Sequence, residues 1–214
     1  MSKSTISNSV IRRLPRYYRF LGELEHNGYI RISSRELSEK MGLTASQIRQ
    51  DFNCFGEFGQ QGYGYNVSDL RFEIGKILGL DTLTPMILLG AGNLGKAIAT
   101  HIDFHNKGFD LIGAFDVNPD IIGKDLGGLK VKSIEEVGTF CAENKPVAAI
   151  LCVPMTSAEK LVNTLIECGI KAFWNFTHYD LKVLHKGIVV ENVHLGDSLT
   201  TLSYGLNNLE SNNK

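Results

Sequence analysis

The residues of this sequence best suited to chemistry form a glycine-rich turn, and the chemistry that they suit is phosphate binding. Gly90, Gly92 and Gly95 follow a short apolar run with G-x-G-x-x-G spacing. The first glycine permits a tight strand-to-helix turn, the second lets the backbone approach a pyrophosphate, and the third lets the helix pack closely on the strand. The helix start also offers unpaired N–H groups and a partial positive charge. The predicted pyrophosphate site comprises Gly90, Ala91, Gly92, Asn93, Leu94 and Gly95.

An acidic residue at the end of the next predicted strand favours a dinucleotide as the ligand. Asp116 closes that strand about 20 residues beyond the glycine turn, which is the spacing of a dinucleotide-binding motif. A carboxylate at this place suits the ribose hydroxyls of an adenosine half and repels a 2′-phosphate, and no arginine follows closely. The pattern therefore favours NAD(H) over NADP(H). The glycine turn alone would also hold coenzyme A or another adenine nucleotide.

Two further strand ends predict the surroundings of the nicotinamide ring. Val153-Pro154 and Asn175-Phe176 each lie at the end of a predicted strand, and ligands of open α/β sheets lie beyond the carboxyl ends of the strands. Val153, Pro154 and Phe176 would form an apolar wall. Because oxidised nicotinamide is cationic and the reduced ring is neutral, such a wall favours NADH on desolvation grounds. Simple core packing is the alternative for Val153 and Phe176.

The elements that must position these residues alternate between strand and helix from Pro85 onward. Such alternation predicts a parallel sheet in a doubly wound, Rossmann-like α/β domain of residues 81–196. A short apolar helix over residues 197–209 has Asp197 as its predicted N-cap, and residues 210–214 form a predicted disordered tail. The strands are predicted at residues 86–90, 110–115, 147–153, 170–175 and 188–193.

Residues 1–80 form a separate predicted helical domain. An apolar stripe with alternating spacings of four and three marks a first helix, which Pro15 either begins or kinks. Capping boxes at residues 33–36 and 44–47 open two short helices with the proportions of a helix-turn-helix. A glycine- and tyrosine-rich stretch over residues 56–67 predicts a hairpin, and helices followed by a hairpin make a winged helix. The stripe consists of Val10, Leu14, Tyr17, Leu21 and Leu24.

The second helix of this pair carries the side chains predicted to read DNA. Arg49 and Gln50 would contact bases, since arginine pairs bidentately with guanine and glutamine with adenine. Residues 1–80 hold eleven Lys/Arg and eight Asp/Glu, whereas residues 81–214 hold eleven and fifteen. This asymmetry is a mild indication of a polyanionic partner on the N-terminal side. A helical dimerisation module with a merely solvated polar face is the alternative.

Composition and residue spacing argue against several other classes of protein. The four cysteines are far apart and form no C-x-x-C pair, which predicts reduced thiols in a cytoplasmic protein and no zinc site. No apolar run approaches the length of a membrane helix, and no signal-peptide pattern begins the chain. The α/β part leaves no room for a substrate domain, and its histidines show no acid–base spacing. We therefore predict no enzymatic activity.

The order and spacing of these motifs resemble the Rex family of redox-sensing transcriptional repressors over nearly the whole chain. The resemblance implies a homodimer with exchanged C-terminal helices. Its winged helices would bind a palindromic operator when NAD⁺ dominates, and NADH would release it. The resemblance also implies repression of genes for fermentation and NADH reoxidation. It is carried by residues 12–18, 47–52, the glycine- and tyrosine-rich stretch, and residues 90–95, 115–117, 153–154, 175–176 and 191–193.

Carried over by position, the resemblance adds site residues to those already predicted. Val117 joins the dinucleotide site beside Asp116. Some relatives carry a basic residue in the wing where Gln60 or Gln61 stands, so this sequence lacks that charge. The predicted set of DNA contacts is Arg12, Arg13, Arg16, Ser46, Gln47, Arg49, Gln50, Gln60, Gln61, Tyr63 and Gly64.

One departure from the family concerns the coupling between the two domains. Some members couple them through an Arg–Asp–Tyr set. Arg19 matches the arginine here, but His194 stands for the aspartate and His101 for the tyrosine, so the ion pair of those members cannot form. We hypothesise that His101 and His194 approach one another and make release from the operator sensitive to pH near neutrality.

Three classes of function remain open on the sequence. The first is a repressor for which NADH and NAD⁺ are the sensed ligands and double-stranded operator DNA is the partner. The second is a small domain for coenzyme A or another adenine nucleotide. The third is a reductase that carries a DNA-like decoy domain. DNA binding that is lost with NADH alone would support the first.

Overall fold

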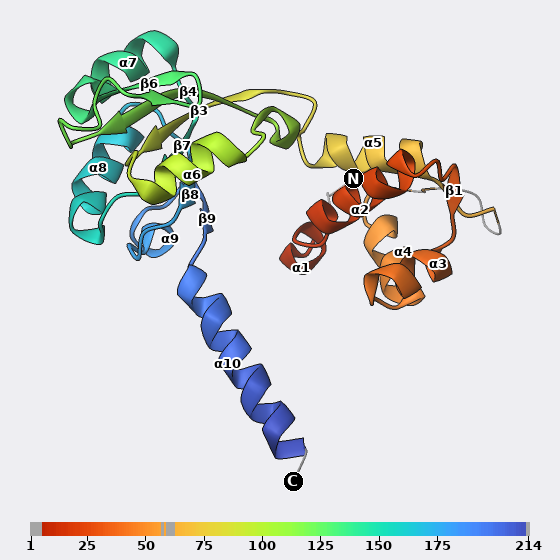
Figure 1. The fold of residues 1–214 in the computed structure, drawn as a ribbon. Helices are drawn as coiled ribbons and strands as arrows, with labels where there is room; N and C mark the ends of the chain where they lie inside the picture. The colour runs from red at the N-terminus through yellow and green to blue at the C-terminus, as the bar shows by residue number, and fades with distance from the viewer. Residues whose placement is uncertain (1–5, 57, 59–62, 213–214) are drawn as a thin grey trace. The chain divides into compact units, whose positions relative to one another are not determined.

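The polypeptide divides into two compact units, residues 1–81 and 82–214. The computed structural model describes residues 6–56, 58 and 63–212. Unit 1 is mainly helical, and unit 2 is built on a seven-stranded sheet (Figure 1). The predicted fold class, a winged-helix domain followed by a Rossmann-like parallel-sheet domain, is confirmed.

Unit 1 is organised around its longest helix, α2 (Leu14–His26). Every residue of the predicted apolar stripe is buried, but Val10 lies on the separate short helix α1 and the other four lie on α2. The buried face of α2 therefore supplies the centre of the core. Pro15 lies in the first turn of α2, where its missing N–H removes no helical hydrogen bond. It therefore begins the helix rather than kinking it. The other elements of unit 1 are α1 (Asn8–Ile11), β1 (Arg31–Ile32), α3 (Ser34–Met41), α4 (Ala45–Asn53), β2 (Tyr65–Asn66) and α5 (Val67–Ile77).

The two predicted capping boxes open α3 and α4, but only the first is complete. Ser33 and Glu36 satisfy each other's backbone N–H groups at the start of α3, and Gly42 ends that helix with a φ of 64°. Thr44 caps α4 by accepting from the N–H of Gln47. The side chain of Gln47 does not return to Thr44, since it donates to a carboxylate one turn further on.

The wing differs from the predicted hairpin. Among the described residues, strand β2 pairs antiparallel with β1, thirty-odd residues earlier. The pairing brings Gly64 against β1, where a Cβ atom would lie 2.8 Å from the carbonyl oxygen of Ile32. Because this pairing is non-local, alternation within the stretch could not identify it. Gln60 and Gln61 lie outside the described residues.

The sheet of unit 2 has the strand order β5-β6-β4-β3-β7-β8-β9. Its strands are parallel except for the β5–β6 pair. All five predicted strands are present, whereas β5 and β6 were not predicted. The strands are β3 (Thr84–Leu89), β4 (Phe109–Asp116), β5 (Asp125–Leu126), β6 (Leu129–Ser133), β7 (Ala148–Leu151), β8 (Ala172–Asn175) and β9 (Val189–Asn192).

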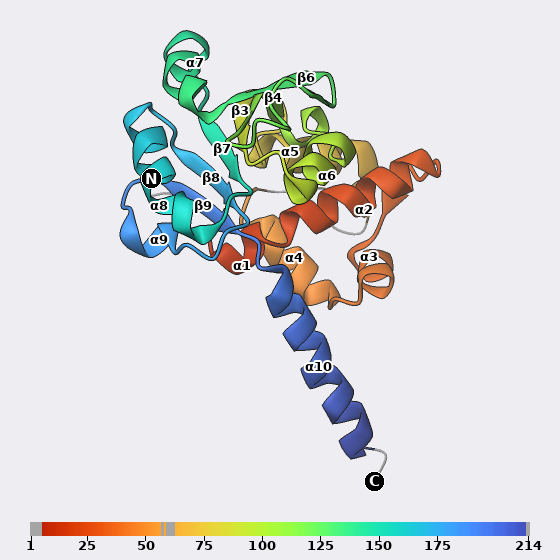
Figure 2. The same cartoon turned by 60° about the vertical axis from the view of Figure 1, so that its left-hand side comes forward.

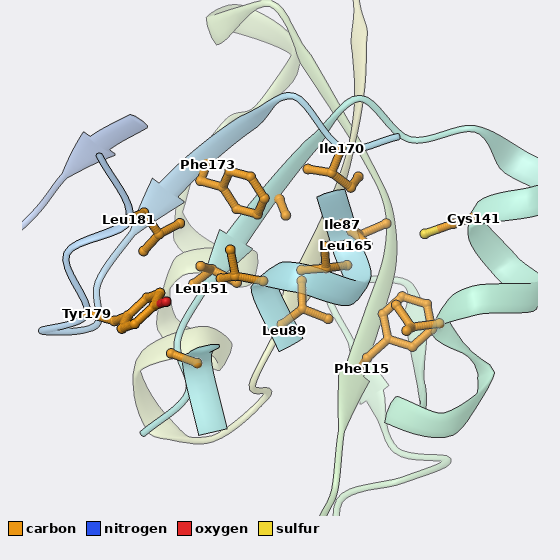
Figure 3. Close-up of a cluster of buried hydrophobic side chains, with 14 residues drawn as sticks. Ile87, Leu89, Phe115, Cys141, Leu151, Leu165, Ile170, Phe173, Tyr179 and Leu181 are labelled. Atoms are coloured by element: carbon orange, nitrogen blue, oxygen red, sulfur yellow. The ribbon is translucent and has the colours of Figure 1, made fainter. Parts of the chain in front are cut away.

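Helices cover the two faces of this sheet unequally. One face carries α7 (Val137–Asn144), α8 (Met155–Glu167) and α9 (Leu181–Leu184), whose apolar residues join Leu89, Leu151 and Phe173 in one core cluster (Figure 3). The other face carries α6 (Asn93–His101), which packs near β3. The second face is therefore less completely covered over β7, β8 and β9. Short 3₁₀ turns lie at His105–Lys107 and Ile134–Glu136.

The last helix, α10 (Leu195–Asn212), extends away from the sheet of unit 2 in both views (Figures 1 and 2). It begins two residues before the predicted N-cap and continues through residues 210–212, which were predicted to be disordered. Asp197 lies in its first turn instead of capping it. Every described side chain from residue 195 to 209 is exposed. Within the described part of the chain, no helix has the length and apolar character of a membrane span.

Candidate functional site

The predicted ligand-binding segments of unit 2 meet at the carboxyl edge of its sheet. Leu89 is in register with Phe115 on one side and with Leu151 on the other, and Asn175 continues the same row. The residues that follow these strands therefore leave the sheet at one level. They are the glycine turn, Asp116, Val153-Pro154 and Phe176, which is the arrangement expected of a ligand site in an open α/β sheet.

The three glycines of the turn have three different surroundings. A Cβ on Gly90, whose φ is 92°, would lie 2.4 Å from the carbonyl oxygen of Cys152. A Cβ on Gly95 would lie 1.9 Å from the carbonyl oxygen of Gly90. A Cβ on Gly92 would meet no atom within 4 Å. Gly90 and Gly95 are thus required by the fold, whereas Gly92 leaves space that a ligand can use, as predicted for a pyrophosphate.

The start of α6 offers its N–H groups to this space. Gly92 is the N-cap and has no side chain with which to cap the helix. The first intrahelical bond runs from the N–H of Lys96 to the oxygen of Gly92, so the N–H groups of residues 93–95 precede the helical ladder. Such a helix start favours an anion through both its donors and its dipole. Asn93 and Leu94 lie here, as predicted.

Asp116 is tied to the glycine turn by a contact that the sequence did not predict. Its Oδ2 accepts from the backbone N–H of Ala91 at 2.7 Å, and its Oδ1 accepts from the N–H of Asn118 at 2.8 Å. The residue is 9% exposed. An ionised carboxylate has about four acceptor positions, so two remain for ribose hydroxyls. Val117 beside it is 75% exposed and offers an apolar surface at the same edge.

Asn175 is placed differently from its prediction. Its side chain is fully buried, donates to the oxygen of Tyr179 and to Oδ1 of Asn192, and accepts from the N–H and hydroxyl of Thr177. These four bonds use its hydrogen-bonding groups within the protein. Asn175 therefore holds the loop after β8 against β9 and does not face a ligand. The predicted position of Asn175 at the end of a strand is correct, but its side chain points into the protein.

The residues of the predicted apolar wall differ in their exposure. Pro154 is exposed as the N-cap of α8, and Val153 is half-buried beside the glycine turn. Phe176 packs edge-on against Trp174 with ring centroids 4.8 Å apart. Val153 and Phe176 thus pack against the core clusters of unit 2, and their role beside a nicotinamide stays a prediction. Among the described residues, no three His, Cys, Asp or Glu side chains gather as metal ligands.

In unit 1, α4 presents the predicted DNA-reading face to solvent. Ser46, Arg49 and Gln50 are exposed, and Nη1 of Arg49 donates to the hydroxyl of Ser34 at 3.0 Å. Tyr63, in the wing, is 71% exposed. These positions leave polar donors and acceptors available on one side of the helix, as base recognition requires.

Two of the predicted DNA contacts, Arg13 and Arg16, have hydrogen-bond partners inside unit 1. Arg13 donates through Nε and Nη2 to both oxygens of Asp51, at 2.6 and 2.8 Å. Arg16 donates to the carbonyl oxygen of Met41 at the end of α3. Arg12 is exposed at the end of α1. Asp51 was missed by sequence reasoning, because a polar residue beside Gln50 gave no sign that its side chain is fully buried.

The hypothesised histidine pair does not form within one chain. His194 stacks on His178, with ring centroids 5.4 Å apart and the planes within 6°, and its Nδ1 is buried without a hydrogen-bond partner. His101 ends α6 at the amino edge of the sheet, whereas His194 follows β9 at the carboxyl edge. Arg19, the third predicted switch residue, is exposed on α2 of unit 1.

His101 lines a cavity of about 600 Å³ on the less covered half of the sheet. The apolar part of its wall includes Met86, Ala148, Trp174 and Val189, which come from four neighbouring strands. Cavities of this size and character hold ligands or side chains of another element.

Comparisons with known proteins agree with the two-unit description. Residues 5–53 match a family described as putative DNA-binding protein N-terminus, and residues 81–179 match a family described as CoA binding domain. The redox-sensing transcriptional repressor Rex of Thermoanaerobacter sp. (strain X514) is 56% identical, over 98% of this chain and 94% of that protein. Such relatives are transcriptional regulators rather than enzymes.

Two solved structures are similar over almost the entire chain. The protein RSP in complex with β-NAD⁺ and operator DNA has a TM-score of 0.90 and 54% identity, covering 97% of this chain and 95% of that one. RSP in complex with β-NADH has a TM-score of 0.87 and 51% identity, covering 97% of both chains. With identity above 50% over nearly its full length, this chain belongs to the Rex family of redox-sensing transcriptional repressors.

Proposed function

We propose that this chain binds operator DNA through unit 1 and senses the NADH/NAD⁺ balance through unit 2. The observation that carries the proposal is the open space at Gly92, with half of the acceptor positions of Asp116 unused beside it. This is a dinucleotide site without a substrate domain, on the same chain as a helix-turn-helix. The RSP structures with β-NAD⁺ and operator DNA, and with β-NADH, support the same assignment.

The reduced cofactor is the proposed releasing ligand. Oxidised nicotinamide is cationic, so an apolar surface such as that of Pro154 and Phe176 favours NADH by desolvation. NADH can shift the repressor only by its difference in affinity for the DNA-free and DNA-bound forms. A shift from 99:1 to 1:99 requires about 5.5 kcal/mol, which two sites in a dimer would share. The regulated genes that we propose are those of fermentation and NADH reoxidation, in the cytoplasm.

On the DNA side, we propose that Arg49 and Gln50 contact base edges in the major groove. Ser46 lies on the same exposed surface, and Arg12, Tyr63 and Gly64 remain proposed contacts to the backbone or minor groove. A two-fold dimer would present two such helices to a palindromic operator, with half-sites separated by about one helical turn of DNA.

The exposed helix α10 supports a homodimer in which the helices are exchanged. Leu195, Leu199, Leu202, Leu206 and Leu209 are 55% to 68% exposed. Their spacing of four and three forms a continuous seam of the kind that packs on another element. A stripe of this length left in water is unfavourable. We propose that the apolar cavity over β7, β8 and β9 receives α10 of a second copy.

The hypothesis that His101 and His194 approach one another therefore requires this exchange between two copies. Seated in the cavity, α10 of one copy would bring the partner's His194 toward His101, whose cavity also includes Asp103, Lys107 and Glu191. Release by NADH would then change between about pH 6 and 8, where histidine titrates. An unchanged response over that range, in the wild type and in His194→Ala, would contradict the hypothesis.

The dimer can be tested by light scattering on the full chain. We expect Leu199→Gln with Leu206→Gln to yield monomers at concentrations where the wild type is dimeric. Thr201→Gln, an exposed change outside the leucine stripe, should leave the mass unchanged. Dimers of equal stability in both variants would contradict the proposal.

Coenzyme A is the second candidate ligand, because the matched family over residues 81–179 is a CoA binding domain. The two ligands are separated by a gel shift on the operator DNA used with RSP, titrated with NAD⁺, NADH and coenzyme A. We expect NADH alone to release the DNA. Release by coenzyme A would favour the second candidate, and no DNA binding under any condition would contradict the repressor function.

A further inference from the structure

The predicted reading helix α4 contains a fully buried carboxylate that is saturated with hydrogen bonds. Oδ1 of Asp51 accepts from Nη2 of Arg13 at 2.8 Å and from Nε2 of Gln47 at 3.0 Å. Oδ2 accepts from Nε of Arg13 at 2.6 Å and from the hydroxyl of Tyr17 at 2.7 Å. Four donors thus occupy about four acceptor positions, and three of these donors lie outside α4.

The contacts within this network favour the ionised forms of Asp51 and Arg13. Burial alone would raise the pKa of Asp51, but the hydrogen bonds from Arg13, Tyr17 and Gln47 lower it below its ordinary value. The bond to Asp51 in turn raises the pKa of Arg13. The pair is therefore ionised at neutral pH. Its two parallel hydrogen bonds constrain the orientation of the carboxylate relative to the guanidinium.

Direction matters here because the other buried side chains of α4 make apolar contacts with the core. Ile48 and Phe52 hold α4 against the core, and apolar contacts are non-directional. A rotation of about 10° about the axis moves atoms at the helix's outer radius by about 1 Å, which is enough to misalign a hydrogen bond to a base edge. The bonds to Asp51 from Tyr17 on α2 and from Arg13, the N-cap residue of α2, resist that rotation.

We propose that Arg13, Tyr17, Gln47 and Asp51 form a positioning network that sets the orientation of α4 toward DNA and that none of the four contacts a base or a phosphate. The proposal rests on the operator binding proposed above. It removes Arg13 and Gln47 from the predicted DNA contacts and gives them a role through Asp51. Arg49 and Gln50 remain the residues that read the bases.

The test is a variant that replaces the network by apolar groups of similar volume, Arg13→Met with Tyr17→Phe and Asp51→Leu. Such replacements of buried ion pairs commonly retain or increase stability, so the variant is expected to fold. We expect the preference for the RSP operator over a scrambled duplex to fall at least tenfold. The salt dependence of binding to the scrambled duplex should stay unchanged, because no phosphate contact is lost.

A matched control is the exposed ion pair of Arg35 and Glu39 on α3, whose side chains are 86% and 64% exposed. Replacing both by alanine should leave sequence preference as in the wild type. Gln47→Met provides a second test that does not depend on the folding of the triple variant. We expect it to weaken discrimination at all operator positions by a similar small factor.

Three outcomes would overturn the inference. The first is wild-type sequence preference in a folded triple variant. The second is a salt dependence of binding, taken as the slope of log K against log salt, that becomes shallower by about 0.9 for each Arg13 side chain replaced in the dimer. That change identifies a phosphate contact. The third is a changed preference at one base pair in Gln47→Met, which identifies a base contact. Failure of the wild type to prefer the operator would instead contradict the proposed function.

Discussion

The two units each contain a buried aspartate, and the two differ in how their oxygens are used. Asp51 of unit 1 accepts four hydrogen bonds, all from side chains of its own unit. Asp116 of unit 2 accepts two, both from backbone N–H groups, with one on each oxygen. The first carboxylate is saturated, whereas the second keeps about two acceptor positions. Saturation by the protein, rather than burial, thus separates Asp51 from the acid that we propose to bind the ligand.

The helix starts beside these aspartates show the same contrast. In unit 1, α4 is capped by the hydroxyl of Thr44. In unit 2, α6 begins at Gly92 without a side-chain cap. A capped helix start satisfies its own donors, and an uncapped one can offer them to an anion. Both differences support the proposed ligand site in unit 2 and the proposed positioning network in unit 1.

The largest expected effect follows from removing the saturated carboxylate. Asp51→Ala leaves the Arg13 guanidinium without its partner, and breaking a buried pair in this way costs about 3–5 kcal/mol. We expect urea denaturation followed by circular dichroism to show that loss in the free energy of unfolding. Asp116→Ala removes only acceptors of two backbone N–H groups and should cost about 1–3 kcal/mol. Equal losses in the two variants would contradict the comparison.

The glycines of the turn give the next largest contrast. Gly95→Ala places a Cβ against the backbone at Gly90 and should destabilise the protein by about 1–3 kcal/mol or more, as overpacking does. Gly92→Ala meets no atom, so its stability should change little while NADH affinity falls. Thermal melts and a fluorescence titration with NADH measure the two quantities. Loss of stability in Gly92→Ala with unchanged NADH binding would refute the assignment.

Acid should act on unit 1 through Asp51. The pKa of Asp51 is lowered in the folded protein. Ionised Asp51 therefore stabilises the fold at pH values above its pKa in the unfolded chain, about 3.9, and this stabilisation is lost as the pH falls through its pKa in the folded protein. Asp51→Asn should therefore be less stable than the wild type at pH 7, with a smaller loss on acidification below about pH 4. Parallel stability curves for the two proteins over this range would show that Asp51 is not responsible.

The smallest effect is expected at the cap of α4. Thr44→Ala removes the acceptor for the N–H of Gln47 and should cost about 1 kcal/mol, whereas Thr44→Ser retains the hydroxyl and should cost less. Urea midpoints of the two variants provide the measurement. A cost for Thr44→Ser equal to that for Thr44→Ala would show that the hydroxyl is not the stabilising group.

The features predictable from the sequence are those that depend on near neighbours. The buried stripe of α2, the capping box at Ser33 and the separate roles of Gly90 and Gly95 each arise from residues a few positions apart. The alternation of strand and helix likewise identified the sheet. Local spacing carries this information because helix and strand have fixed periods.

The features that the sequence did not reveal depend on partners far along the chain. Arg13 lies 38 residues away from Asp51, to which it donates, β2 pairs with β1 far earlier in the chain, and Asn175 bonds to Asn192 on the next strand. A polar residue that is satisfied inside the protein has the same sequence pattern as one that contacts a ligand. Only the geometry distinguishes them.

The central claim is that a dinucleotide bound beside Asp116 controls DNA binding by α4. The most direct measurement is fluorescence anisotropy of the operator DNA used with RSP, at constant total cofactor and increasing NADH/NAD⁺ ratio, for the wild type and Asp116→Ala. We predict that NADH releases the wild type, while Asp116→Ala binds the same DNA equally well and responds only at higher ratios. Operator binding by the wild type that is independent of the ratio would contradict the claim.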